Sequence, residues 1–188
     1  MTPVNPILRH LIELIGNVAD AHTVALFTME PGGKTLAIRE YFSLSSHLNP
    51  RAKIAVGKGP IGVTAQTRKH QLIENFDQDT SFLGIYKKNE ELKNFIALPV
   101  IYGDQVAVLA IDSKERYQFS IKLEKILTEF AQQIAWNLQS ENPDNSEDLS
   151  PQPFLQEINS YCRFLAESPD RSSVADRLTQ IPSSLIPC

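Results

Sequence analysis

The chain has 188 residues, of which 42% are hydrophobic and 21% are charged, a composition typical of one compact domain with an additional segment. Its formal net charge of −4 argues against nucleic acid as a partner, because binding a phosphate backbone requires a basic surface. The only cysteines are Cys162 and Cys188, so the sequence offers neither a disulfide framework nor a Cys-x-x-Cys metal site, and a reducing, cytoplasmic compartment is expected.

The N-terminal half of the chain predicts a helix followed by several short strands. Asn5 can cap the helix, Pro6 suits its first turn, and apolar residues recur at helical spacing as far as Val18. The pattern of apolar segments and turn residues then predicts, in order, paired strands at residues 23–29 and 35–44, a brief strand at 53–56, a short helix at 61–69 and a strand at 71–75.

A second hairpin, formed by residues 94–101 and 106–112, is apolar on both faces, so both sides of its sheet must be covered. A long helix capped by Ser120 carries an apolar stripe that extends to Leu138, and we expect it to share one face with the first helix. Only the short elements of residues 60–94 remain to cover the other face. This arrangement predicts a ligand pocket between the sheet and a thin lid.

The composition of the chain changes after Ser140. Acidic residues are interleaved with prolines over residues 141–153, which predicts a solvated linker. Residues 154–188 return to helical spacing, and within them residues 174–188 resemble residues 7–22 at the N-terminus. We therefore predict a domain at residues 1–140 and, after the linker, a helical segment that opens a second, similar domain, so that further C-terminal domains are expected.

From about Ile7 to Leu138 the chain resembles a GAF domain. The features that match are, in chain order, Gly57-Lys58-Gly59-Pro60-Ile61-Gly62-Val63, then Asn75-Phe76-Asp77 with Asp79-Thr80-Ser81-Phe82, Leu98-Pro99-Val100 before Gly103, residues 107–113, and Gln132-Gln133-Ile134-Ala135 in the closing helix. The resemblance implies an α+β, GAF/profilin-like fold with a central antiparallel sheet, terminal helices on one face and a lid of short helices and loops on the other. It also implies regulation rather than chemistry, because members of the family sense a small molecule, or dimerise, and pass a conformational change to neighbouring domains.

The resemblance does not identify an effector or a cofactor. Cyclic-nucleotide-binding members carry an Asn-Lys-Phe-Asp-Glu pattern, and this chain contains no Asp-Glu dipeptide. Phytochrome-like members attach a bilin through cysteine, and the free methionine sulfoxide reductases of this fold use pocket cysteines, whereas no cysteine precedes Cys162 here. We therefore expect a protein that is not an enzyme.

Two motifs allow a functional and a structural interpretation. Gly57-x-Gly59-x-x-Gly62 matches the dinucleotide-binding fingerprint, but Pro60 restrains the turn where phosphate should contact free amides, and the neighbouring strands form antiparallel hairpins. The structural turn is the preferred interpretation.

The four histidines lack the spacing of metal ligands, so surface or turn roles are expected and no metal site is predicted. They are His10, His22, His47 and His70.

The candidate pocket residues combine apolar surface with polar groups that would orient a ligand. They are Phe27, Phe42, Ile61, Asn75, Asp77, Asp79, Phe82, Tyr86 and Leu98. The structural alternative for single residues is that Asp77 and Asp79 cap turns and that Phe82 fills the core.

Two functions remain open at this stage. The first is the regulatory sensor domain of a bacterial-type signalling protein, which binds a small organic effector between sheet and lid and relays the event through its terminal helices. The alternative is a ligand-free dimerisation module whose pocket is filled by aromatic side chains. The wide apolar surfaces of the terminal helices predict a homodimer, and the structural alternative is that these surfaces are buried in the core of the domain. No apolar run is long enough to span a bilayer and no signal-peptide pattern is present, so no membrane partner is expected.

Overall fold

The computed structural model describes residues 5–76, 79–116 and 119–141, so the predicted linker after Glu141 and the C-terminal segment lie outside the described residues. The elements are, in chain order, α1 (Pro6–Val18), β1 (Thr23–Met29), β2 (Thr35–Ser43), β3 (Lys53–Ala55), α2 (Gly59–Thr67), β4 (Gln71–Glu74), the 3-10 helix η1 (Thr80–Leu83), β5 (Asn94–Tyr102), β6 (Gln105–Ser113) and α3 (Ile121–Ser140). Across the described ranges, no helix has both the length and the apolar character that crossing a bilayer requires.

The strands form one six-stranded sheet in the order β3-β2-β1-β6-β5-β4. Every pair of neighbouring strands runs antiparallel, which confirms the predicted α+β fold class. Antiparallel pairing also removes the parallel strand-helix-strand unit on which a dinucleotide fingerprint depends. The glycine turn before α2 is therefore a structural feature.

The glycines of that turn are needed for close packing. Gly59 begins α2 with a φ of +58°, a backbone conformation that side chains disfavour. A Cβ on Gly62 would lie 2.3 Å from the carbonyl oxygen of Ala55, so no larger residue fits there without moving the backbone. The turn thus brings α2 directly against the end of β3.

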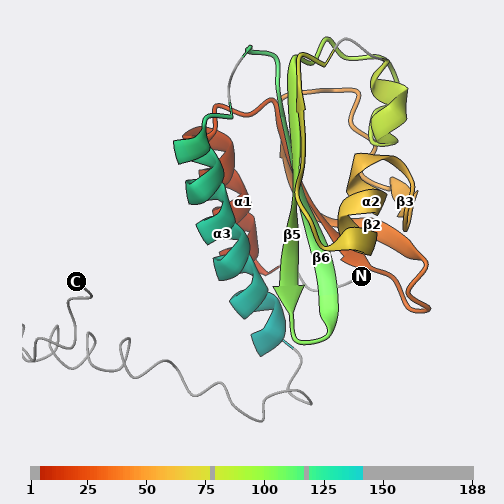
Figure 1. The fold of residues 1–188 in the computed structure, drawn as a ribbon, viewed down its shortest axis with the longest axis vertical. Coiled ribbons are helices and arrows are strands. Elements are labelled where there is room, and N and C mark those ends of the chain that lie inside the picture. The colour runs from red at the N-terminus through yellow and green to blue at the C-terminus, as the bar shows by residue number, and fades with distance from the viewer. Residues whose placement is uncertain (1–4, 77–78, 117–118, 142–188) are drawn as a thin grey trace, which may run out of the picture. The chain divides into compact units, whose positions relative to one another are not determined.

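The sheet separates two layers of cover, as Figure 1 shows: α1 and α3 pack on one face, and α2 and the segments around it pack on the other. The buried residues between the sheet and the terminal helices are called the helix-side core, and they include Leu8, Ile12, Ile15, Val24, Leu26, Ile96, Leu98, Leu109, Ile111, Leu127 and Ile134. The buried residues on the opposite face are called the lid-side core, and they include Ala25, Phe27, Leu36, Ile54, Ile61, Phe76, Leu83, Ile85, Tyr86, Phe95, Val108 and Ala110. Both faces of the central hairpin are covered, as its apolar composition requires.

The terminal helices begin at the caps that the sequence predicts. The Asn5 side chain accepts hydrogen bonds from the backbone N–H groups of Ile7 and Leu8, at 3.0 and 3.1 Å. The Ser120 hydroxyl accepts one from the backbone N–H of Leu123, at 3.3 Å. These caps fix where each helix starts against the sheet.

Two candidate pocket residues, Phe42 and Leu98, lie on the helix side of the sheet and not beneath the lid. The register between β1 and β2 shifts between Leu26 and Phe27, since Leu26 pairs with Glu40 and Phe27 with Ile38. This bulge reverses the alternation along β2, so that Ile38 packs against the lid-side core and Phe42 against the helix-side core.

Leu98 belongs to the helix-side core as well. Its strand, β5, is apolar on both faces, so the sequence alone does not indicate which side each residue faces. The predicted placement of both Phe42 and Leu98 beneath the lid is therefore corrected by the structure.

Candidate functional site

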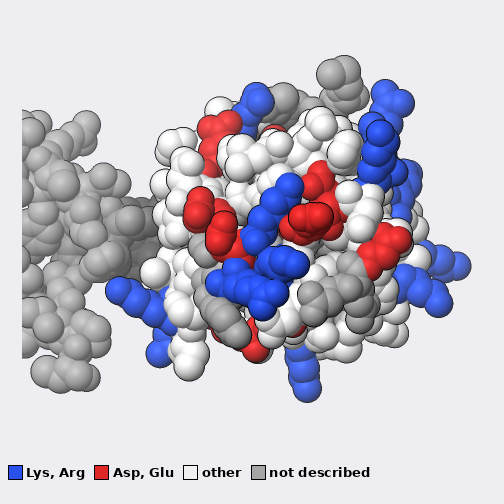
Figure 2. Space-filling view, turned by 90° about the horizontal axis from the view of Figure 1, so that it is seen from above, with Lys and Arg blue, Asp and Glu red and all other residues white. Residues whose placement is uncertain are grey.

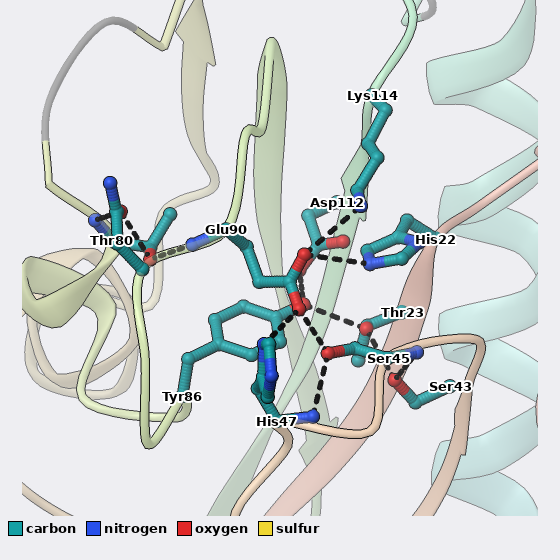
Figure 3. A network of polar contacts seen from close by, with 11 residues as sticks. His22, Thr23, Ser43, Ser45, His47, Thr80, Tyr86, Glu90, Asp112 and Lys114 are labelled. Carbon is teal, nitrogen blue, oxygen red and sulfur yellow. Dashed lines mark hydrogen bonds and ion pairs between the residues drawn. The ribbon is translucent and has the colours of Figure 1, made fainter.

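A polar network lies at one end of the sheet, beneath the segment that follows η1. We call residues 79–93 the lid segment. It begins with Asp79, whose side chain caps η1 by accepting a hydrogen bond from the backbone N–H of Ser81 at 2.8 Å. Leu83 is buried, Gly84 takes a left-handed conformation with a φ of +71°, and the chain then runs back over the sheet. This path carries two polar residues, Tyr86 and Glu90, onto the ends of the central strands (Figure 3).

Tyr86 makes the deeper of the two connections. Its hydroxyl lies 2.6 Å from Asp112 Oδ2, at the end of β6, and 2.7 Å from Thr23 Oγ1, at the start of β1. The phenol has a single proton, so it donates to one of these oxygens and accepts from the other partner. Thr23 Oγ1 in turn lies 2.8 Å from Ser43 Oγ, which extends the chain of hydroxyl groups to β2.

Asp112 is a buried carboxyl group with incomplete hydrogen bonding. Its Oδ1 atom has no hydrogen-bond partner among the described residues. Burial raises the pKa of Asp112 to about 7, although the hydrogen bonds from Tyr86 and from the Thr23 backbone oppose this shift. Burial beside this carboxyl group also raises the pKa of Tyr86, so its phenol stays protonated. The lid-side core therefore holds an acid whose charge changes near neutral pH.

Glu90 makes the second connection, at the edge of the same network. Its carboxylate lies 3.0 Å from Lys114 Nζ, 3.1 Å from His47 Nδ1 and 3.4 Å from His22 Nε2, and it accepts a hydrogen bond from the hydroxyl of Ser45. The Glu90 side chain is only 9% exposed. Acidic and basic groups therefore lie beside one another at this end of the molecule, as Figure 2 shows.

The charges around Glu90 determine its ionisation. Burial by itself raises the pKa of a carboxyl group, but the hydrogen bonds from Ser45 and Lys114 and the charges of Lys114 and His22 outweigh it, and the pKa of Glu90 falls to about 2. Burial and the charge of Lys114 lower the pKa of His22, against the attraction of Glu90. At neutral pH Glu90 is thus an anion held by Lys114.

The positions of these partners along the chain matter as much as their chemistry. His22 lies between the end of α1 and the start of β1, and Lys114 lies directly after β6, in the connection to α3. Ser45 and His47 belong to the connection between β2 and β3. One carboxylate in the lid segment therefore contacts the connections to both terminal helices.

The structure brings three of the predicted site residues together. Phe27 and Ile61 are fully buried in the lid-side core, together with Tyr86. Asn75 and Asp79 are exposed, in a turn and at the cap of η1, and the Phe82 side chain is 52% exposed. Phe42 and Leu98 face the terminal helices, and Asp77 lies outside the described residues.

Several members of the network are not predicted from the sequence. His22 and His47 are expected at the surface or in turns, yet both contact Glu90, and the His22 side chain is only 11% exposed. Asp112 carries a usable signal, because it is a single acidic residue in an otherwise apolar strand. Glu90 carries none, since it lies among other charged residues between Lys87 and Lys93.

A metal-binding role has no support in the part of the chain that the structure describes. Within these ranges, no group of three or more His, Cys, Asp or Glu side chains is arranged to hold a metal ion. The network includes a lysine ammonium, that of Lys114, which is paired with Glu90, and the contacts within the network are hydrogen bonds and ion pairs.

Comparisons with known proteins agree on the fold. The family model described as GAF domain matches residues 2–139. No curated protein sequence matches the chain.

Solved structures of low sequence identity share this architecture. The chain is similar to the GAF domain of an Acinetobacter phosphoenolpyruvate-protein phosphotransferase, with 17% identity, a TM-score of 0.61 and coverage of 78% of this chain and 90% of that one. It is similar to the GAF domain of a two-component sensor histidine kinase from Bacillus halodurans, with 16% identity, a TM-score of 0.58 and coverage of 77% and 97%. It is also similar to a type II free methionine-R-sulfoxide reductase from Thermoplasma acidophilum, with 16% identity, a TM-score of 0.56 and coverage of 69% and 87%. The same fold thus occurs as a domain of a phosphotransferase, as a domain of a sensor histidine kinase, and in a methionine sulfoxide reductase.

Proposed function

Because the chain belongs to the GAF domain family, we propose that it is the regulatory sensor domain of a signalling protein, and that a small organic effector binds between its sheet and its lid segment. Signalling proteins of two kinds, a sensor histidine kinase and a phosphotransferase, contain domains of this fold. The observation that carries the proposal is the position of Glu90, which joins the lid segment to the connections of both terminal helices.

The chemistry beneath the lid indicates what kind of effector would fit. Asp112 Oδ1 is a buried acceptor without a partner among the described residues. A ligand that donates a hydrogen bond to this oxygen would gain binding free energy from it. The neighbouring lid-side core is apolar and includes the buried side chains of Phe27 and Ile61, which an effector would reach by displacing part of the lid segment. An effector with an amine or hydroxyl group on an apolar body would satisfy both.

The network provides a route for the relay. An effector that enters beneath the lid segment competes with Tyr86 and Glu90 for their partners, because these two side chains occupy the polar end of the sheet. Its binding free energy therefore depends on whether the lid segment is attached to His22 and Lys114 or released from them. A shift between these two states changes the contacts at the ends of α1 and α3.

The experiment measures stability and amide hydrogen exchange in the full chain. A metabolite panel is divided into compounds with and without an amine or hydroxyl group, and binding is detected by an increase in melting temperature. We expect a stabilising compound to alter amide exchange in the lid segment and at residues 22 and 114. The variant Glu90→Gln should lose the coupled change at these two residues, while the neighbouring exposed variant Glu91→Gln should retain it. A panel without a stabilising compound contradicts effector binding, and an unchanged response in Glu90→Gln contradicts the relay.

Regulation rather than catalysis is part of this proposal. The described residues include no cysteine, because Cys162 and Cys188 both lie in the C-terminal segment. A cysteine-based reduction of methionine sulfoxide is therefore not proposed for the sheet–lid region of this chain, although its fold is similar to that of the Thermoplasma acidophilum reductase.

A second candidate function, dimerisation, is favoured by the outer surface of α1. Ile7, Leu11, Leu14 and Val18 follow one another at intervals of four, three and four residues, the spacing of a helix-helix seam. Ile7, Leu14 and Val18 are 61%, 38% and 43% exposed, whereas Leu11 is partly buried against the helix-side core, so this stripe borders the buried one that packs on the sheet. A second copy of the chain would cover it.

Sedimentation of the full chain tests this second candidate. We expect a dimer for the unmodified chain and a monomer for Leu14→Lys, because a charge at the centre of the seam opposes its burial. Asn17→Lys adds the same charge at an exposed position on the same helix, outside the stripe, and should remain dimeric. A monomeric unmodified chain, or equal behaviour of the two variants, contradicts the dimer.

A further inference from the structure

A hollow lies at the edge of the sheet, away from the polar network. β4 pairs with β5 only from Asn94 to Ala97, so within the described residues no strand flanks Leu98–Tyr102 on that side. α3 passes beside this part of β5 and contributes two small side chains, those of Thr128 and Ala131. The resulting hollow has a volume of about 440 Å³, within the range of small-molecule sites.

The walls of the hollow combine an apolar floor with a basic rim. Leu98, Pro99 and Ala131 supply apolar surface, and the lining residues with ionisable side chains are all basic. They are Arg68, Lys69 and His70, three consecutive and exposed residues. This accumulation contrasts with the formal net charge of −4 of the whole chain.

The backbone holds the basic rim in place. Arg68 ends α2 in a left-handed conformation with a φ of +55°, a position where helices usually carry glycine. Its guanidinium donates a hydrogen bond to the backbone oxygen of Asp104 at 2.7 Å. A guanidinium has five N–H donors, so this bond fixes the side chain and leaves donors for an anion.

We propose that this hollow, the edge site, binds a small organic anion, with an aromatic or branched aliphatic body and a carboxylate or phosphate group. The apolar body would cover Leu98 and Ala131, because burying such surface is favourable. The anionic group would contact Arg68, Lys69 and His70 at the rim. The edge site shares no residue with the polar network, so it does not depend on the function proposed above.

We test the edge site by titrating the full chain with benzoate, phenyl phosphate and benzamide. Binding is monitored by the nuclear magnetic resonance signals of the backbone amides. We expect saturable shifts at Leu98, Thr128 and Ala131 with the two anions, and binding at least about tenfold weaker with neutral benzamide, because only the anions pair with the basic rim. The ratio between benzoate and phenyl phosphate identifies the preferred anionic group. Equal binding of benzamide, or shifts confined to the lid segment, overturns the proposal.

Variants separate the two halves of the site. The double variant Lys69→Gln/His70→Gln should weaken benzoate binding about fivefold, because solvent-facing ion pairs contribute modestly. The control variant Lys122→Gln/Lys125→Gln removes two charges from α3 outside the hollow and should bind as the unmodified chain does.

A second variant tests the hollow by filling it. Thr128 is exposed, so Thr128→Phe is compatible with folding and should abolish the anion-induced shifts at Leu98. Glu90→Gln should leave benzoate affinity unchanged, which distinguishes the edge site from the lid. Unchanged affinity in the double variant or in Thr128→Phe overturns the proposal.

Discussion

The two faces of the sheet are closed by different kinds of interaction. The helix-side core is built from apolar side chains such as Ile12, Ile15 and Leu109, which pack without directional requirements. The lid side combines apolar packing with the buried groups of Thr23, Tyr86 and Asp112, whose hydrogen bonds must match in distance and direction. The contribution of the helix side to stability therefore does not depend on protonation. The contribution of the lid side depends on protonation and on any molecule that competes for its polar atoms.

The largest effect is expected on the helix side. Ile15→Ala removes a fully buried side chain between α1 and the sheet and should lower the free energy of unfolding by about 2–5 kcal/mol. Urea denaturation of the full chain measures this loss. The matched control is Ile121→Ala at the start of α3, where the side chain is 77% exposed and the loss should be small. Equal losses in the two variants would contradict the assignment of the faces.

A smaller effect is expected when the lid loses its phenolic hydroxyl. Tyr86→Phe keeps the ring but leaves Asp112 and Thr23 without this partner, so the free energy of unfolding should fall by about 1–3 kcal/mol. Tyr41→Phe removes a hydroxyl from a side chain that is 41% exposed and should have almost no effect in the same urea experiment. If both variants unfold alike, the buried hydrogen bonds do not stabilise the lid.

The pH dependence of the free energy of unfolding distinguishes the lid side from the helix side, because Asp112 on the lid side changes its charge. Its pKa is about 7 in the folded chain, against an ordinary value of 3.8 for an aspartate in water, so the folded state binds more protons between these values. The free energy of unfolding should therefore fall as pH rises from about 4 to about 7, by at most about 1.4 kcal/mol per pH unit from this group. Asp112→Asn should remove this component, and the exposed control Asp104→Asn should keep it. A decline that is the same in both variants would assign it to other groups.

The smallest effect is expected for Glu90, which lies at the edge of the network. Its pKa is about 2 in the folded chain, against an ordinary value of 4.5 for a glutamate in water, so its contribution is complete above pH 4.5 and is lost as pH falls toward 2. Glu90→Gln should cost roughly 1 kcal/mol at neutral pH, because its partner cation Lys114 is 45% exposed and stays solvated when the charge of Glu90 is removed. Glu91→Gln is the matched control, and an equal loss there would contradict a specific role for Glu90.

The elements of this fold are largely predictable from the sequence. The start of α1 follows from Asn5 and Pro6, and the central hairpin follows from two apolar segments around Gly103, because these signals act between near neighbours. The predicted strand at residues 23–29 agrees with β1. The pattern also indicates that both faces of the sheet are covered.

The candidate site is predicted less well, for reasons that lie in register and distance. The bulge opposite Leu26 and Phe27 moves Phe42 to the helix side, and no local signal in β2 marks this change. Glu90 contacts His22 from a distant part of the chain, and this contact depends on the path of the lid segment.

The amino-acid sequence alone thus determined the order of helices and strands, their caps and the need to cover both faces, since propensity, capping and apolar periodicity are local properties. Only the tertiary structure decided which side chains face the lid, that one carboxylate joins the lid segment to both helix connections, and that a basic-rimmed hollow opens where β4 begins. These features arise from strand register and from contacts between segments that are distant along the chain. Local patterns in the sequence do not reveal either of them.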